Sequence, residues 1–244
     1  MEDTTEARYQ SILRTLDSLG DAESVAGMAR FGITGKKVYG VSVAELRKMA
    51  KDTGAGHELA QRLWDSEIRE ARLLATMIDD PRGVTEHQME RWAAGFDNWE
   101  TCDQCCMNLF ENTPHAYRKA AEWACREEEF VRRAGFVLMA RLAVSDKKAS
   151  DERFLQFLPL IIHGASDARN FVKKAVNWAL RQIGKRSLFL NARAVETADK
   201  IKVSGLPSGK WVAQDALREL LSEPVQSRLR ARLRSLRGGP EGCS

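Results

Sequence analysis

Residues 132–143, RRAGFVLMARLA, and residues 173–184, KKAVNWALRQIG, share one pattern: a basic doublet, then Ala, then an apolar run that ends in Leu. Apolar residues recur in both segments at helical rather than strand spacing, so both are predicted to be helices. The same local design occurs twice at a separation of about 40 residues, which is a first indication of a repeated helical unit.

The rest of the chain continues this helical pattern. Breaks at Gly, Asp, Pro or Ser occur roughly every 12 to 20 residues. Ser42, with Glu45 three residues later, predicts one helix start as a capping box. Alternating Val, Ile and Tyr runs and Asn-Gly turns are nearly absent, so no sheet is expected. We expect about fourteen helices, over residues 5–18, 21–31, 42–52, 56–66, 68–79, 85–96, 98–113, 115–128, 129–143, 151–165, 167–186, 187–201, 208–223 and 223–236.

Short helices joined by tight loops predict an all-α protein. Helix pairs that recur at roughly 35–45 residues are typical of a right-handed α-α superhelix, or solenoid, of HEAT-like repeats. A globular helix bundle is the alternative architecture. Because no linker or sharp change in composition divides the chain, we expect a single domain over residues 1–237 and a flexible tail over residues 238–244.

The composition limits the class of protein. The chain has 244 residues, of which 43% are hydrophobic and 30% charged, as in a globular protein. It contains no apolar run long enough for a membrane span, and its first residues, MEDTTEARYQ, do not resemble a secretory leader. The 5 cysteines lack the spacing of a disulfide framework, so we expect reduced thiols in a cytoplasmic protein.

The charges are distributed unevenly along the chain. Residues 167–237 carry 16 Lys and Arg against 6 Asp and Glu, whereas residues 1–166 carry 22 against 27. Such asymmetry within one soluble chain indicates a polyanionic partner for the C-terminal half. A basic surface that only faces solvent is the alternative.

Three cysteines crowd into residues 96–106, FDNWETCDQCC. Asp97 and Glu100 have the spacing of a capping box, so a helix is expected to start at Asn98 or Trp99. On that helix the cysteines share the face of later apolar residues, which predicts buried, inert thiols. A structural zinc site would need a second ligand pair, and none is recognisable.

Asp103 is the unusual residue of this helix, because it lies about 40° from Trp99 at the edge of the apolar face. A buried carboxylate without a partner is costly, so Asp103 must either form a salt bridge or line a cleft. Arg133 raises the same question, since its helix is apolar nearly all round. It is expected to pair with an acid or to reach a ligand phosphate. Arg132 is turned about 100° away, toward solvent.

Trp178 lies off the core stripe of its helix. The residues that share its face, within about 60°, are Phe171, Lys174, Arg181 and Lys185. A large aromatic ring on a basic face is typical of a nucleic-acid surface, where the charges meet phosphates and the ring meets a sugar or base. The alternative is a Trp that a neighbouring helix covers. Three other tryptophans, Trp64, Trp92 and Trp123, have apolar neighbours at helical spacing and are expected in the core.

In order, these motifs resemble those of the DNA alkylation repair family, the AlkD-like alkylpurine glycosylases. The resemblance rests on NWETCD (98–103), FVRRAGFVL (130–138) and KKAVNWALRQ (173–182), with support from MARFGITGKKVYGVSVAELRKMA (28–50) and LWDSEIREARLLATMID (63–79). It extends from about residue 22 to residue 221. Phe31 stands where relatives often have Tyr, and Ser42-Val43 where they often have Pro or a polar pair.

The resemblance implies a HEAT-like solenoid with a concave basic face that holds duplex DNA, and excision of cationic N3- and N7-alkylated purines without metal or cofactor. It implies that Asp103 is the catalytic carboxylate and that Trp99 and Trp178 flank the deoxyribose of the lesion. Arg133 would hold a nearby phosphate. The candidate DNA-binding residues are Lys174, Arg181, Lys185, Arg132 and Phe171.

The expected partner is therefore double-stranded DNA with alkylated purines, bound by a monomer without a membrane association. A HEAT-like module that binds damaged or branched DNA without cutting is the alternative, and retention of Asp103 with both tryptophans favours the enzyme. A solenoid that binds only proteins is disfavoured by the basic C-terminal half.

Overall fold

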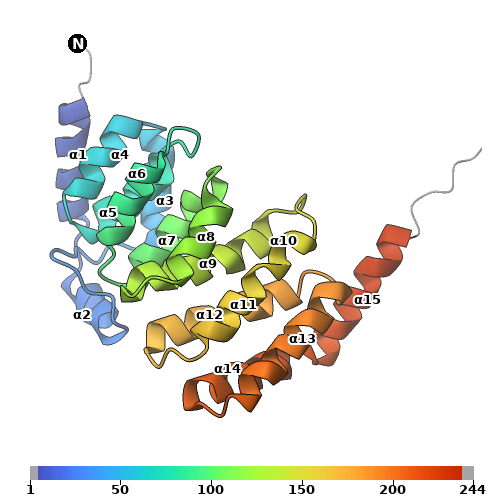
Figure 1. Cartoon of the computed structure of the whole chain (residues 1–244). Helices are drawn as coiled ribbons and strands as arrows, with labels where there is room; N and C mark the ends of the chain where they lie inside the picture. Colours follow the sequence, from blue (N-terminus) through green and yellow to red (C-terminus); the bar gives the residue numbers. More distant parts are fainter. Residues whose placement is uncertain (1–4, 238–244) are drawn as a thin grey trace, which may run out of the picture. The chain divides into compact units, whose positions relative to one another are not determined.

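A computed structural model describes residues 5–237 of the chain. Within them the secondary structure consists of fifteen α-helices and one 3-10 helix (Figure 1). A single isolated bridge between Lys37 and Ile68 is the one β-type pairing of these residues. The prediction of an all-α protein is thus confirmed. Residues 238–244, predicted to be a tail, lie outside the described part.

The chain forms two compact units, Met1–Ala116 and Tyr117–Ser244. The prediction of a single domain over residues 1–237 stays a prediction. The first unit contains α1 (Thr5–Ser18), α2 (Ala22–Arg30), α3 (Val43–Thr53), α4 (His57–Asp65), α5 (Arg69–Ile78), α6 (Glu86–Ala94), α7 (Trp99–Asn108) and η1 (Phe110–Asn112). At the boundary α8 (Ala116–Ala124) begins, and the second unit continues with α9 (Glu129–Ser145), α10 (Glu152–Leu155), α11 (Phe157–Gly164), α12 (Asn170–Gly184), α13 (Leu188–Val203), α14 (Pro207–Leu220) and α15 (Glu223–Arg237).

The observed helices agree with the predicted ranges, with two differences. The segment predicted as one helix over residues 151–165 is divided into α10 and α11. Pro159 explains the division, because it lacks the N–H that would bond to the carbonyl of Leu155 and its ring crowds that carbonyl. The end of the predicted helix 98–113 is the short 3-10 turn η1.

The core of the first unit is built around two tryptophans. Trp64 on α4 and Trp92 on α6 stack with ring centroids 4.2 Å apart and nearly parallel planes. They are 3% and 0% exposed. Trp123, in the second unit, is also fully buried. The three core tryptophans predicted from the sequence are therefore confirmed.

In the second unit α8 packs closely on α9 at Gly135. A Cβ at this position would collide with the backbone nitrogen of Ala124. Gly usually weakens a helix interior, but here the missing side chain permits the close approach of the two helices. The basic doublet and apolar run at 132–143 therefore form one of a pair of helices in contact, as the repeat pattern predicts.

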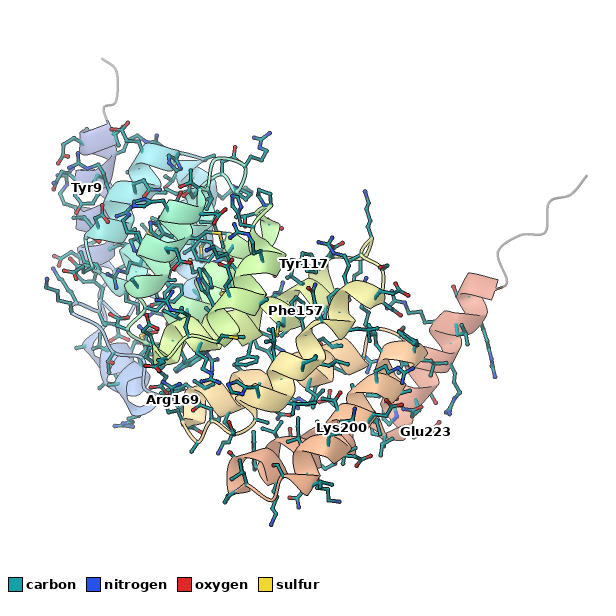
Figure 2. All side chains as sticks on the ribbon, viewed as in Figure 1. Tyr9, Tyr117, Phe157, Arg169, Lys200 and Glu223 are labelled. Carbon is teal, nitrogen blue, oxygen red and sulfur yellow. The ribbon has the colours of Figure 1, made fainter. Side chains whose placement is uncertain are left out.

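Tyr117 lies near the start of α8, at the opposite end of this helix from Ala124 (Figure 2). Its ring stacks on Phe157 with centroids 6.0 Å apart, and the Arg153 guanidinium lies 3.8 Å from the ring centroid. The Tyr117 hydroxyl donates a hydrogen bond to Asp146 (2.9 Å). Burial and this bond to a carboxylate raise the pKa of Tyr117 to about 12, because both disfavour the phenolate.

Candidate functional site

The helix that carries Trp99 and Asp103 starts with a side-chain cap. Asn98 is the N-cap residue, and its side-chain oxygen accepts hydrogen bonds from the backbone N–H groups of Glu100 (3.0 Å) and Thr101 (2.9 Å). The predicted start of the helix at Trp99 is confirmed, whereas the capping role assigned to Asp97 is wrong. Asn is as good an N-cap as Asp, and here it stands one residue closer to the helix.

The same two residues tie α7 to the segment that follows α2. The Asn98 side chain donates a hydrogen bond to the backbone oxygen of Thr34 (2.9 Å). The indole Nε1 of Trp99 donates to the backbone oxygen of Phe31 (2.9 Å). Trp99 is half-buried, and Phe31 is 74% exposed. The orientation of the Trp99 ring is therefore set by a residue far away in the sequence.

Glu100 fixes the first turn of α7 to α5. It accepts a hydrogen bond from the Nε of Arg69 (2.7 Å), and Arg69 also donates to Glu70 (2.8 Å) and to the backbone oxygen of Val41 (3.0 Å). Burial opposes the Arg69 cation, but its bonds to Glu100 and Glu70 outweigh that cost and raise the pKa of Arg69. This buried network holds α7 in place.

The network also shapes the turn at Tyr39 and Gly40, which precedes α3. The Glu70 carboxylate accepts hydrogen bonds from the backbone N–H of Tyr39 (3.0 Å) and of Gly40 (2.9 Å). Gly40 has φ of +88°, and a Cβ there would collide with the backbone oxygen of Asp21. Only glycine fits this turn without strain.

Asp103 lies one helical turn after Trp99 on α7, so the two side chains share a face. It is 8% exposed. The three cysteines of the same helix are 0% exposed, as the sequence predicts. Burial raises the pKa of the Cys105 and Cys106 thiols well above the usual value, so they are neutral and poor nucleophiles or metal ligands at neutral pH.

Arg133 lies on α9 of the second unit. It is 7% exposed, and one terminal nitrogen donates to the backbone oxygen of Phe171 at the start of α12 (2.6 Å). The Phe171 ring packs against Phe130 with centroids 5.6 Å apart. The Nε of Arg132 lies 3.6 Å from Asp167, with the side chain only 14% exposed, so Arg132 is less open to solvent than predicted.

Trp178 is half-buried on α12, and Lys174, one turn before it, is exposed. The expectation that Trp178 lies off the core is confirmed by this exposure, whereas Val176 and Leu180 on the opposite side are fully buried. Lys174 belongs to no ion pair within residues 5–237, so its charge is available to an outside anion.

Two predicted phosphate contacts have carboxylate partners on α14. Arg181 lies 2.8 Å from Glu219 and 3.4 Å from Asp215, and Lys185 lies 2.6 Å from Glu219. Asn177 donates a hydrogen bond to Asp215 (2.6 Å). These contacts hold α12 to α14 and partly neutralise the basic face. A role of Arg181 and Lys185 in DNA binding stays a prediction.

The sequence pattern does not single out Trp211 on α14, which is 39% exposed. The Nζ of Lys173 lies 5.0 Å from the centroid of its ring. The signal that marks it in the sequence is the pair Lys210-Trp211 within an otherwise amphipathic helix. Exposure, which depends on packing between helices, distinguishes Trp211 from the buried tryptophans.

The candidate catalytic residues fall into two pairs. Trp99 and Asp103 lie together on α7 of the first unit, and Arg133 and Trp178 lie on α9 and α12 of the second. A common site for all four stays a prediction. Across residues 5–237 there is no cluster of three or more His, Cys, Asp or Glu side chains that could hold a metal ion. Nor does that part of the chain include a helix long and apolar enough to span a membrane.

A protein-family profile described as DNA alkylation repair enzyme matches residues 12–220. One similar solved structure is described as "a new family of proteins related to the HEAT-like repeat DNA glycosylases with affinity for branched DNA structures". It is 21% identical to this chain, covers 79% of this chain and 82% of its own, and has a TM-score of 0.70. This likeness establishes a HEAT-like repeat fold. No curated protein matches the chain.

Proposed function

The chain belongs to the DNA alkylation repair enzyme family, and from this we propose that it is a DNA glycosylase that removes cationic N3- and N7-alkylated purines from duplex DNA. The proposed products are 3-methyladenine and 7-methylguanine, released in the first step of base excision repair. The proposed enzyme acts in the cytoplasm as a monomer and uses neither metal nor cofactor.

The chemistry requires few groups. A purine alkylated at N3 or N7 already carries a positive charge, so it leaves without a general acid. As the glycosidic bond breaks, positive charge develops on the deoxyribose, and a fixed carboxylate stabilises it and orients the attacking water. Indole rings beside the sugar add cation–π stabilisation. Asp103 is the proposed carboxylate, Trp99 and Trp178 the indoles, and Arg133 the phosphate ligand.

The placement of Asp103 carries this proposal. Its side chain is 8% exposed and lies one turn from the half-buried indole of Trp99. A carboxylate in a poorly hydrated place interacts more strongly with a cation than one in bulk water. The cap at Asn98 and the ion pair of Glu100 with Arg69 fix the helix, which supports a preorganised rather than mobile carboxylate.

The decisive experiment replaces this carboxylate with its neutral isostere. We expect Asp103→Asn to lower the rate of 7-methylguanine release from methylated duplex DNA by about a hundredfold or more, with unchanged or tighter DNA binding. Asp52→Asn is the matched control, since Asp52 is an exposed acid of the same unit. Wild-type excision by the Asp103→Asn variant contradicts the catalytic assignment.

The second candidate function is binding of branched or damaged DNA without base excision. The similar solved structure, described as having affinity for branched DNA, favours it. Purified protein that binds junction DNA but releases no alkylpurine from methylated DNA would establish this function instead.

A further inference from the structure

The exposed indole of Trp211 lies on α14 where this helix meets the start of α12. It is 39% exposed, although a Trp side chain is mostly buried in a typical core. The Lys173 ammonium lies over the ring, 5.0 Å from its centroid. A cation at this distance is attracted by the ring electrons and helps to hold the ring in place. Part of the ring stays open to solvent.

The contacts between α12 and α14 change from ion pairs to a cation–π contact at Trp211. On α14, positions 211, 215 and 219 follow one another at one-turn spacing, so they lie on one stripe. Asp215 and Glu219 supply carboxylates to Arg181 and Lys185 on α12. At the first position of the stripe an indole takes the place of the acid. Lys173 on α12 therefore meets the Trp211 ring instead of a carboxylate of this stripe.

A local excess of positive charge surrounds the ring. Lys210, which precedes Trp211, is exposed, and Lys173 is partly exposed. Neither belongs to an ion pair in the part of the chain that the structure describes. Lys173, which lies over the ring, the exposed Lys210 that precedes it in the sequence, and the partly exposed Trp211 are together called the Trp211 surface.

We propose that the Trp211 surface binds an unpaired nucleotide of gapped or branched DNA, with the base stacked on Trp211 and the flanking phosphates on Lys173 and Lys210. A partly exposed aromatic ring in contact with a lysine suits this ligand because every base has a stacking face and every nucleotide a phosphate. A base inside a duplex has both faces covered by its neighbours, so intact duplex offers the ring no partner. The inference rests on the DNA binding in the proposed function and does not require base excision.

The test compares intact duplex with the same unmethylated duplex carrying a short single-stranded gap, both fluorescently labelled. The wild-type protein is expected to bind the gapped duplex more tightly. Trp211→Ala should lower the affinity for gapped DNA roughly tenfold and leave that for intact duplex unchanged. Trp211→Phe, which keeps an aromatic ring, should retain most of the affinity. The fluorescence of 2-aminopurine placed in the gap should be quenched by wild type and not by Trp211→Ala.

Phe189→Ala is the matched control. Phe189 on α13 is 43% exposed and has the Arg193 guanidinium 5.5 Å from its ring centroid. Arg193 differs from Lys173 in that it pairs with Glu196 (3.0 Å). The Phe189→Ala variant should therefore bind both DNAs as wild type does. Thermal melting of each variant establishes that it is folded.

Three results overturn the inference: unchanged gapped-DNA binding by Trp211→Ala, an equal loss on intact and gapped DNA, or an equal loss in Phe189→Ala. Failure of the proposed enzyme activity would look different. In that case wild type would release no alkylpurine from methylated duplex, while its gap preference and the effect of Trp211→Ala would persist.

Discussion

At the scale of single residues, the proposed chemistry depends on side chains that the fold holds in partly or fully desolvated places. Asp103 and Arg133 are charged residues with exposures of 8% and 7%. Trp99 and Trp178 are half-buried. Charged groups in poorly hydrated places interact strongly with a ligand charge, as the proposed roles of Asp103 and Arg133 require.

Trp178 offers a test that separates chemistry from binding. Removal of the ring in Trp178→Ala should slow 7-methylguanine release roughly tenfold, because cation–π stabilisation of the charged sugar is lost. Affinity for undamaged duplex should change much less, since phosphate contacts dominate it. Single-turnover excision and equilibrium binding measure the two effects. An equal loss in both would make Trp178 a general DNA contact rather than a catalytic residue.

Tyr117 offers a test of the second unit that is independent of DNA. It should ionise near pH 12, later than an ordinary tyrosine, and its burial and bond to Asp146 should then be lost. Because the folded-state pKa is raised above the unfolded value of about 10, the stabilisation is complete below pH 10 and falls as pH rises through 12.

Absorbance at alkaline pH follows the tyrosinates directly. The chain has 3 Tyr, so Tyr117→Phe should remove the late step and leave the other two. A single transition near the ordinary tyrosine pKa in wild type would contradict the buried Tyr117 of this structure.

At the scale of elements, the first unit holds α7 by contacts that run to distant parts of the sequence. Residues 97–100 reach Arg72, Thr34, Phe31 and Arg69, respectively. The turn before α3 depends on the same network through Glu70. Asp103 therefore lies on a helix whose first turn is held both by α5 and by the segment that follows α2.

Arg69→Met tests this anchoring. The substitution leaves the carboxylates of Glu70 and Glu100 buried without their cation, which should lower the free energy of unfolding by about 3 kcal/mol or more. Urea titration followed by circular dichroism measures the change. Arg82→Met is the control, because the Arg82 side chain is 89% exposed in its pair with Asp80, and the unfolding midpoint should not move. A neutral effect of Arg69→Met would mean that the network does not stabilise α7.

At the scale of the whole molecule, charge is distributed unevenly, with an acidic excess in residues 1–166 and a basic excess in residues 167–237. The basic excess of residues 167–237 falls within the second unit. Part of it is neutralised internally by Asp215 and Glu219, while Lys173, Lys174 and Lys210 belong to no ion pair within residues 5–237. This asymmetry predicts that the second unit provides more of the electrostatic attraction to DNA than the first.

Salt dependence measures this attraction. If about six phosphates are neutralised, the DNA affinity should fall by about a thousandfold between roughly 50 and 200 mM salt. Lys174→Ala should reduce the slope of log affinity against log salt by about one. Lys51→Ala, at an exposed lysine of the first unit, should leave the slope unchanged. A flat salt response in wild type would remove DNA as the ligand.

Local sequence is sufficient to predict much of this protein's secondary structure and core. The helices, the cap at Ser42, the buried tryptophans and the inert cysteines all followed from periodicity and capping, because such features depend on neighbours within a few residues. The order of the motifs also led to the family. The division of the predicted helix 151–165 into α10 and α11 depends on one residue, Pro159, and the periodicity of the segment does not show it.

Only the tertiary structure decided which charges remain available. Arg181, Lys185 and Lys173 are all basic residues of the predicted helix 167–186, but the first two meet carboxylates of α14 and the third meets the ring of Trp211. The hydrogen bond from Trp99 to Phe31 joins residues that are 68 positions apart. Helical periodicity specifies the face on which a side chain lies, whereas its partner depends on how distant helices pack, and no local pattern encodes that packing.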